Sequence, residues 1–136
     1  MPTGFAFSHR IDVRFRDCDP RKHVNNAVYH TYLEESRLAL WRHLFGPGGM
    51  PGAGTILART EIDFLAPAFA HDPLEVRVNI ADLGGSSITM TYDIVNAASQ
   101  RPLVRAKAII VTFDYATNRS TPIPAEARSV LETLRR

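Results

Sequence analysis

The stretch RFRDCDPRKHVNNAVYHTYLEESR, from Arg14 to Arg37, decides how this chain folds. It begins at the end of an alternating apolar and polar pattern, is interrupted at Asp19-Pro20, and then continues with helical periodicity. Proline lacks a backbone N–H and fixes its own φ, so a strand that reaches Pro20 ends there. The interruption places two carboxylates, a histidine and two adjacent asparagines immediately before the helix. Such a group of side chains predicts a functional site as well as a turn.

The segments on either side of the interruption have different periods. Residues 5–15 alternate with period two, which predicts a half-buried strand. Residues 25–44 follow the period of an α-helix, and apolar side chains around most of its circumference indicate a mostly buried helix. Glu34, Glu35 and Arg37 are spaced to form an ion-pair network on this helix. Glycines and prolines from residue 46 onward end the helix in a loop.

The rest of the chain predicts more strands and a short helix. Four alternating segments follow, at residues 55–65, 73–81, 87–95 and 103–115. The last of these is the richest in apolar residues and is expected in the centre of the sheet. A helix over 125–134 follows Pro124, a residue suited to a first helical position. The order predicts an α+β fold in one domain, residues 1–136, with four consecutive hairpin-linked strands in a five-stranded, largely antiparallel sheet that covers the long helix.

Composition excludes several classes of protein. The chain has 136 residues, a net charge of +2 and a single cysteine, Cys18, so no intrachain disulfide can form. The basic residues are dispersed, which argues against a nucleic-acid partner. No stretch is long and apolar enough to span a membrane, and the N-terminus lacks a signal-peptide pattern. We therefore expect a cytoplasmic protein. The histidines lack metal-ligand spacing, and there is neither a G-x-S-x-G motif nor a glycine-rich phosphate loop.

Three sequence pieces carry a family resemblance: D-x-D at residues 17–19, H-V-N-N at 23–26 and E-E-x-R at 34–37. Together they resemble the hotdog-fold acyl-CoA thioesterases of the 4-hydroxybenzoyl-CoA thioesterase type. The common pattern of these enzymes is D-x-D-x-x-G-H-V-N-N-x-x-Y followed by F-E-E-A-R. Similarity at residues 64–76 and 106–115 extends the resemblance over most of the chain. It implies a sheet wrapped around the long helix and the hydrolysis of an acyl-CoA thioester to a free acid and CoA.

The resemblance also implies catalytic groups. Asp19, the second carboxylate of D-x-D, would act as nucleophile or general base on the thioester carbonyl. A backbone N–H at the start of the helix, near Asn26, would hold the oxyanion. A helix N-terminus supports this role because it presents unpaired N–H donors and a partial positive charge. Because a thiolate is a good leaving group, the reaction needs no metal or organic cofactor.

The neighbouring residues have both structural and chemical interpretations. Asp17 is a second catalytic candidate, and the alternative is that it positions the loop. His23 is an acid or a substrate contact, and the alternative is a packed or capping histidine. Asp19 itself is also a turn former. The charges of the two aspartates should raise the pKa of Cys18, which argues against a nucleophilic thiolate.

Substrate contacts are expected from both the helix and the strands. Asn25 suits the N-cap of the helix, leaving a neighbouring N–H for the substrate, and Tyr29 is expected in the core or in the pocket wall. Arg59 is a candidate for CoA binding by its charge. The family resemblance implies homodimers joined edge to edge, or tetramers built from them, with the active site at the interface. Asp19 would then face residues such as Thr60 of a partner copy.

One position departs from the family pattern. The family has glycine where this chain has Lys22. If the turn requires a positive φ, lysine is strained there, or the turn differs in shape. The Lys22 ammonium group is also a candidate contact for ligand phosphates.

Two other functions remain open at this stage. Hotdog folds also include hydratases and dehydratases of hydroxyacyl thioesters, which rely on a histidine such as His23, although the D-x-D motif argues against this function. A non-catalytic acyl-CoA-binding module would share the pocket. The sequence leaves open the acyl group, the choice between CoA and acyl carrier protein, covalent attack against water activation, and dimer against tetramer.

Overall fold

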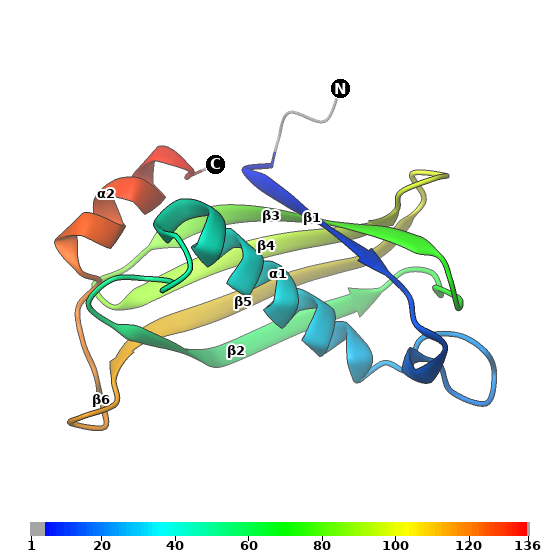
Figure 1. Cartoon of the computed structure of the whole chain (residues 1–136), viewed down its shortest axis with the longest axis horizontal. Coiled ribbons are helices and arrows are strands. Elements are labelled where there is room, and N and C mark those ends of the chain that lie inside the picture. Colours follow the sequence, from blue (N-terminus) through cyan, green and yellow to red (C-terminus); the bar gives the residue numbers. More distant parts are fainter. Residues whose placement is uncertain (1–4, 136) are drawn as a thin grey trace.

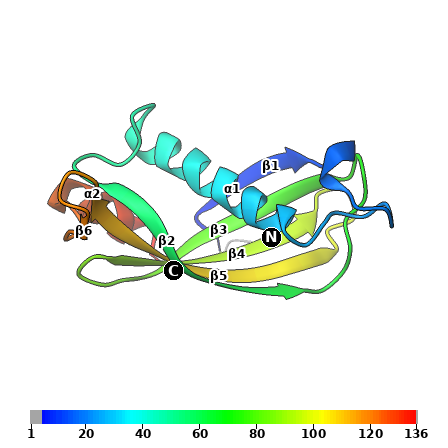
Figure 2. The same cartoon turned by 90° about the horizontal axis from the view of Figure 1, so that it is seen from below.

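The computed structural model describes residues 5–135, in which two α-helices lie against one curved antiparallel sheet (Figures 1 and 2). The elements in chain order are β1 (Phe7–Asp12), the short 3-10 helix η1 (Phe15–Asp17), α1 (Val28–Phe45), β2 (Gly54–Phe64), β3 (Pro73–Leu83), β4 (Ser87–Asn96), β5 (Pro102–Asp114), β6 (Arg119–Ser120) and α2 (Ala125–Thr133). The predicted α+β class, the sheet and the two helices are therefore confirmed.

The strand order of the sheet is β1-β3-β4-β5-β2, with β6 paired to the end of β5. Hairpins join β3 to β4 and β4 to β5, and all of the pairings between named strands are antiparallel. The expectation of four consecutive hairpin-linked strands is wrong for β2, which pairs with β5 rather than with β3. The reason is that β1 occupies the free edge of β3. Strand β5 is interior, as its apolar sequence predicts, but the middle position belongs to β4.

Helix α1 crosses the concave face of the sheet (Figure 2). Its buried residues point toward the sheet and are Tyr29, Tyr32, Leu33, Ser36, Leu40 and Trp41. The alternating inward residues of β3 and β4 supply the other half of the core, among them Val76, Val78, Ile88 and Met90. The expectation that α1 is buried nearly all round is only partly met, because Leu38 remains 50% exposed. One side of the helix faces an open groove.

Helix α2 closes the end of the core next to the C-terminal end of α1 (Figure 1). Ala127 and Leu131 are fully buried and belong to the same hydrophobic cluster as Trp41. Pro124 lies at the N-cap of α2, one residue before the predicted position. Between β5 and α2 lies the two-residue strand β6, which is too short to give a periodic signal in the sequence.

Candidate functional site

The loop between β1 and α1 is a tight backbone turn around Asp19. The Lys22 N–H donates to the Asp19 carbonyl at 2.8 Å, and the Asp19 N–H donates to the His23 carbonyl at 3.0 Å. The Asp19 side chain accepts a bond from the Arg21 N–H at 2.9 Å through Oδ1. These bonds leave the second carboxylate oxygen, Oδ2, 3.9 Å from Nδ1 of His23. The turn therefore fixes the Asp19 carboxylate beside the His23 ring.

Lys22 occupies the turn position that requires a positive φ. Its φ is 72°, in the left-handed region. A side chain at such a φ costs roughly 1 kcal/mol or more relative to glycine, because Cβ crowds the backbone. The strain that a positive φ predicts at Lys22 is therefore present.

Replacing Lys22 by glycine should raise the free energy of unfolding. The gain from removing the strain is about 1 kcal/mol, reduced by the greater flexibility of glycine in the unfolded chain. Urea unfolding of the native protein and of Lys22→Gly measures it. The matched variant is Arg21→Gly, at a neighbouring position without a positive φ, which should be destabilising. A Lys22→Gly protein less stable than the native one would contradict the assignment of strain.

Asp17 ties the loop to helix α1. Its Oδ2 accepts bonds from the Tyr32 hydroxyl at 2.7 Å, the Arg14 N–H at 3.1 Å and Arg14 Nε at 3.3 Å. Its carbonyl accepts the Asn25 N–H at 3.0 Å. The Asp17 carboxylate is buried behind the loop, whereas Asp19 is partly exposed. This geometry favours the positioning interpretation of Asp17 over direct chemistry.

The protonation states of this loop follow from its contacts. Burial raises the pKa of the Asp17 carboxyl, but the hydrogen bonds from Tyr32 and Arg14 and the Arg14 charge outweigh burial, so the pKa is lowered. Burial also raises the pKa of the Cys18 thiol, and the charges of Asp17, Asp19 and Asp72 add to the effect. Cys18 therefore stays a neutral thiol, in line with the expectation that it is not a nucleophile.

The start of α1 presents a backbone donor. The Asn25 Oδ1 accepts the Ala27 N–H at 2.9 Å, so the Asn25 side chain satisfies one of the donors at the start of the helix. The Val28 N–H bonds to the Asn25 carbonyl. Among residues 5–135 the Asn26 N–H has no acceptor. Neither asparagine is the N-cap, which is Ala27, but Asn25 performs the expected capping two residues earlier.

Two cavities lie at this loop, one lined by His23 and the other by Asp19. One, of about 230 Å³, is lined by His23, Asn26, Tyr29 and Phe64, together with Val24, Leu65, Ala66 and Pro67. The other, of about 280 Å³, is lined by Phe15, Cys18, Asp19, Pro20, Lys22 and Ala70. A backbone bridge between His23 and Phe69 and an edge contact of their rings lie at this loop. The structure thus brings Asp19 to His23, and His23 to Asn26 and Tyr29, in two adjoining spaces.

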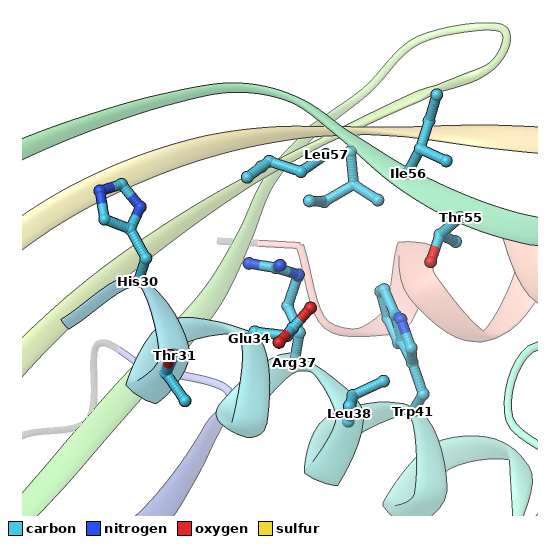
Figure 3. Close-up of a pocket in the computed structure, with 10 residues that line it drawn as sticks. His30, Thr31, Glu34, Arg37, Leu38, Trp41, Thr55, Ile56 and Leu57 are labelled. Carbon is cyan, nitrogen blue, oxygen red and sulfur yellow. The ribbon is translucent and has the colours of Figure 1, made fainter. Parts of the chain in front are cut away.

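A third cavity, of about 270 Å³, continues along the groove between α1 and β2 (Figure 3). His30, Glu34, Leu38 and Trp41 line it from the helix, and Leu57 lines it from the strand. The cavity that contains Asn26 lies between the same two elements, near the helix N-terminus, where Tyr29 packs on Phe64. The two spaces therefore follow one groove from the start of α1 toward its C-terminal end, which we call the α1/β2 groove.

The expected ion-pair network on α1 is wrong. No Glu34–Arg37 ion pair within 4.0 Å occurs among the described residues. Glu35 lies 3.1 Å from Nε2 of His9, and Arg37 donates to the Tyr92 hydroxyl at 3.1 Å. The arginine reaches from the helix toward the sheet, as Figure 3 shows. Whether Arg37 contacts Glu34 or Tyr92 depends on the rotation of α1 about its own axis. The spacing of residues in the sequence does not specify that rotation.

Thr60 and Arg59 lie on opposite faces of β2. Thr60 is opposite the buried Ala108 and faces the helix side, and its Oγ1 is buried without a hydrogen-bond partner among residues 5–135. Arg59 lies on the outer face, 3.4 Å from Glu61. Thr60 therefore lies beside the α1/β2 groove, whereas Arg59 of the same chain points away from it.

The sequence did not reveal several contributors to this region. The Tyr32 hydroxyl is a hydrogen-bond donor to Asp17. Phe15, in the loop, and Phe69, in the connection between β2 and β3, are 79% and 46% exposed. The available signal for Phe15 was an apolar residue two positions before the D-x-D motif.

Two kinds of feature are absent from the described residues. No group of three or more His, Cys, Asp or Glu side chains that could hold a metal ion occurs among residues 5–135. Within the same range, neither helix has the length and apolar character required to cross a membrane.

Comparisons with known proteins point to one family. A family model for the thioesterase-like superfamily matches residues 13–131. The acyl-CoA thioester hydrolase YbgC of Escherichia coli O157:H7 is 26% identical over 121 residues, covering 87% of this chain and 90% of YbgC. The uncharacterized protein YsmA of Bacillus subtilis (strain 168) is 29% identical over 90 residues, covering 66% of this chain. Only 61% of YsmA is spanned by the match.

The chain is also similar to solved structures of thioesterases. The structure of a thioesterase superfamily protein from Jannaschia sp. CCS1 matches with a TM-score of 0.91 and 27% identity, covering 99% of this chain and 96% of that one. A thioesterase from Thermus thermophilus, complexed with coenzyme A and Zn, matches with a TM-score of 0.82 and 30% identity, covering 94% and 98%. The fold is the hotdog fold, and the chain belongs to the thioesterase-like superfamily of thioester hydrolases.

Proposed function

We propose that the protein hydrolyses an acyl-CoA thioester, with Asp19 attacking or activating water and the Asn26 N–H holding the oxyanion. The observation that carries the proposal is the placement of both groups around His23. The Asp19 Oδ2 lies 3.9 Å from one ring nitrogen, and Asn26 shares a cavity with the same ring. The Asn26 N–H is unpaired among the described residues and lies at a helix N-terminus.

The chemistry needs few groups. As an oxygen nucleophile adds to the thioester carbon, negative charge develops on the carbonyl oxygen, where the Asn26 N–H stabilises it. If water attacks, Asp19 accepts its proton; if Asp19 attacks, an acyl anhydride forms and water then cleaves it. In both routes the C–S bond breaks, the thiolate leaves and takes up a proton, and the free acid is released. His23 is placed to contact either the carboxylate or the thioester sulfur.

Thiol release from a panel of short-chain, long-chain and aromatic acyl-CoAs tests the proposed function. We expect turnover of at least one member, with CoA and the free acid formed in equal amounts. A folded protein that binds acyl-CoA and releases no thiol from any member would contradict hydrolysis and favour a binding module. Addition of water to an enoyl-CoA without thiol release would favour the hydratase.

A second copy of the chain is the expected partner. Strand β2 pairs with β5 on one side only, so its other edge is unpaired among residues 5–135. Exposed apolar side chains follow this strand, namely Leu57, Phe64 and Leu65. An exposed edge with apolar side chains is stabilised by pairing with the same edge of a second copy. The partner would also cover the α1/β2 groove.

Replacing Leu57 by aspartate should therefore separate the dimer. The charge would lie at the centre of the β2 interface, and desolvating it without a partner is unfavourable. Light scattering should give a mass near twice 15.2 kDa for the native protein and near 15.2 kDa for the variant, with loss of thiol release. The control is Ser8→Asp on β1, at the opposite edge of the sheet, which should stay dimeric. A dimer that survives Leu57→Asp but not Ser8→Asp would assign the interface to β1.

A further inference from the structure

The cavity lined by Phe15, Cys18, Pro20 and Ala70 shares Asp19 with the candidate site. Its volume is about 280 Å³. Of the groups in the proposed hydrolysis, only Asp19 lines this cavity, whereas Asn26 and His23 line the cavity between α1 and β2. A thioester extends in two directions, as an acyl group from the carbonyl carbon and as a carrier chain from the sulfur. The cavity lined by Asp19 and the groove that contains Asn26 provide one space for each.

The walls of this cavity are mostly apolar, with Asp19 and Lys22 as the charged residues that line it. Phe15 is 79% exposed, an unusual state for a large aromatic side chain, and it is free to cover a ligand. Cys18 contributes an uncharged thiol, because burial and the nearby aspartates raise its pKa. A neutral, partly apolar chain therefore fits this space.

Two cations of the loop have no ion-pair partner among the described residues, and one of them lines the cavity. Lys22 lines it, and Arg21 precedes Lys22 in the same turn. Neither has a carboxylate within 4.0 Å among residues 5–135. Arg14, in the same loop, is paired with Asp17. Lys22 also keeps a left-handed backbone that glycine would adopt without strain. Unpaired cations beside an apolar cavity suit a chain that ends in a phosphate.

The acyl arm of the thioester would lie in a space with a different lining. The α1/β2 groove runs along the helix and is lined by Tyr29 and Phe64 near the helix start and by Leu38, Trp41 and Leu57 farther along. Its apolar residues extend over several helical turns, which suits an acyl group, and His30, Glu34 and Arg37 add polar groups to the lining. Assigning the acyl group to the groove leaves the carrier arm for the cavity beside Lys22.

We propose that this cavity receives the phosphopantetheine arm of the substrate and that Lys22 binds its phosphate, an inference that rests on the proposed function. Phosphopantetheine joins the sulfur to a phosphate through a neutral chain with a gem-dimethyl group. It is shared by CoA and by acyl carrier proteins, so the same subsite serves either source. The turn that positions Asp19 for the reaction thus also selects the carrier through its neighbour Lys22.

Binding measurements test this assignment independently of turnover. Calorimetry is performed with pantetheine, 4′-phosphopantetheine and CoA on the native protein, Lys22→Gln, Lys22→Arg and Lys107→Gln. Lys107 is the chain's other lysine and is exposed on the outer face of β5. We expect Lys22→Gln to weaken 4′-phosphopantetheine and CoA about tenfold, the size of one charge-assisted contact, and to leave pantetheine unchanged. Lys22→Arg should retain most of the affinity, and Lys107→Gln all of it.

Several outcomes would overturn the proposal. The proposal is wrong if Lys22→Gln weakens pantetheine binding as much as 4′-phosphopantetheine binding, or if it weakens neither. It is also wrong if Lys107→Gln lowers the affinity by the same factor, or if no probe binds to the native protein. A loss for CoA without a loss for 4′-phosphopantetheine would move the contact to the nucleotide phosphates. If the probes bind as expected but no acyl-CoA is hydrolysed, the subsite stands and the proposed hydrolysis fails, so the two failures are distinguishable.

Kinetics and a cavity variant complete the test. With an acyl-CoA that turns over, Lys22→Gln should raise KM about tenfold with little change in kcat, and should leave KM for the matching acyl-pantetheine unchanged. If KM rises equally for the acyl-CoA and for the same acyl group carried on acyl carrier protein, the phosphopantetheine arm that they share is the bound group. If KM rises for only one of these substrates, that substrate is the one whose phosphate Lys22 binds. Phe15→Ser should weaken pantetheine itself. If Phe15→Ser instead dissociates the dimer and leaves pantetheine affinity unchanged, Phe15 belongs to an interface and the proposal is wrong.

Discussion

Replacing Asp19 by asparagine should lower kcat for thioester hydrolysis by about a hundredfold or more, as expected for removal of a general base or nucleophile. Asparagine has nearly the same shape, and its Oδ1 can still accept the Arg21 N–H that Asp19 accepts at 2.9 Å. The turn should therefore persist while the basic and nucleophilic oxygen is lost. Thiol release under saturating acyl-CoA measures the effect, and KM should change little.

The control for this substitution is Asp12→Asn, which removes a carboxylate that is exposed on β1 outside the loop. Its kcat should equal that of the native protein. Activity that survives Asp19→Asn would move the chemistry to His23 or to Asp17. Mass spectrometry of the protein quenched during turnover distinguishes the two routes, because only direct attack leaves an acyl group on Asp19.

Replacing Asp17 by alanine should lower the free energy of unfolding by about 3 kcal/mol. The variant removes the acceptor for the Tyr32 hydroxyl, which is fully buried, and for the Arg14 N–H. A buried donor left without a partner costs about 1–3 kcal/mol, and hydrogen bonds to a charged acceptor are stronger than neutral ones. Thermal unfolding should show a midpoint lowered by roughly 10 °C.

Tyr32→Phe is the matched variant, because it removes one donor and leaves the carboxylate held by Arg14. It should cost about 1 kcal/mol. The double variant should be less destabilised than the sum of the two single variants, since both remove the same bond. Additive effects would show that Asp17 and Tyr32 stabilise the protein independently, in conflict with the 2.7 Å contact.

The Asp17 contribution should also depend on pH. The pKa of Asp17 is lowered in the folded protein relative to its ordinary value near 4. A lowered folded-state pKa means that the unfolded chain binds the proton more readily. The stabilisation is therefore complete above the ordinary pKa and is lost as the pH falls through the folded-state pKa. The difference in stability between the native protein and Asp17→Asn should shrink in acid; a difference that grows would contradict the lowered pKa.

Local patterns were sufficient to predict most of the elements. The alternation before Asp19-Pro20 predicted β1, although the strand ends at Asp12 rather than at residue 15. The helical period after Asn25 predicted α1, which begins at Val28. These boundaries differ because hydrogen bonds such as that from the Ala27 N–H to Asn25 Oδ1 set the ends. The period of a sequence does not contain that information.

The loop was predictable because its parts are close in sequence. Asp19, Lys22 and His23 are joined by a single turn, and even the positive φ of Lys22 followed from the family pattern. Short loops of this kind are determined by residues within a few positions of one another. The candidate site is therefore mostly encoded by consecutive residues.

The sequence by itself determined the elements, the turn and the group of polar side chains before α1, because all of these depend on neighbouring residues. Only the tertiary structure decided that β2 pairs with β5, that Arg37 bonds to Tyr92 rather than to Glu34, and that Thr60 faces the groove while Arg59 does not. Each of these depends on which strand edge remains free and on how the helix is rotated over the sheet. Such choices are made by burial of the whole core, and no local period of the sequence specifies them.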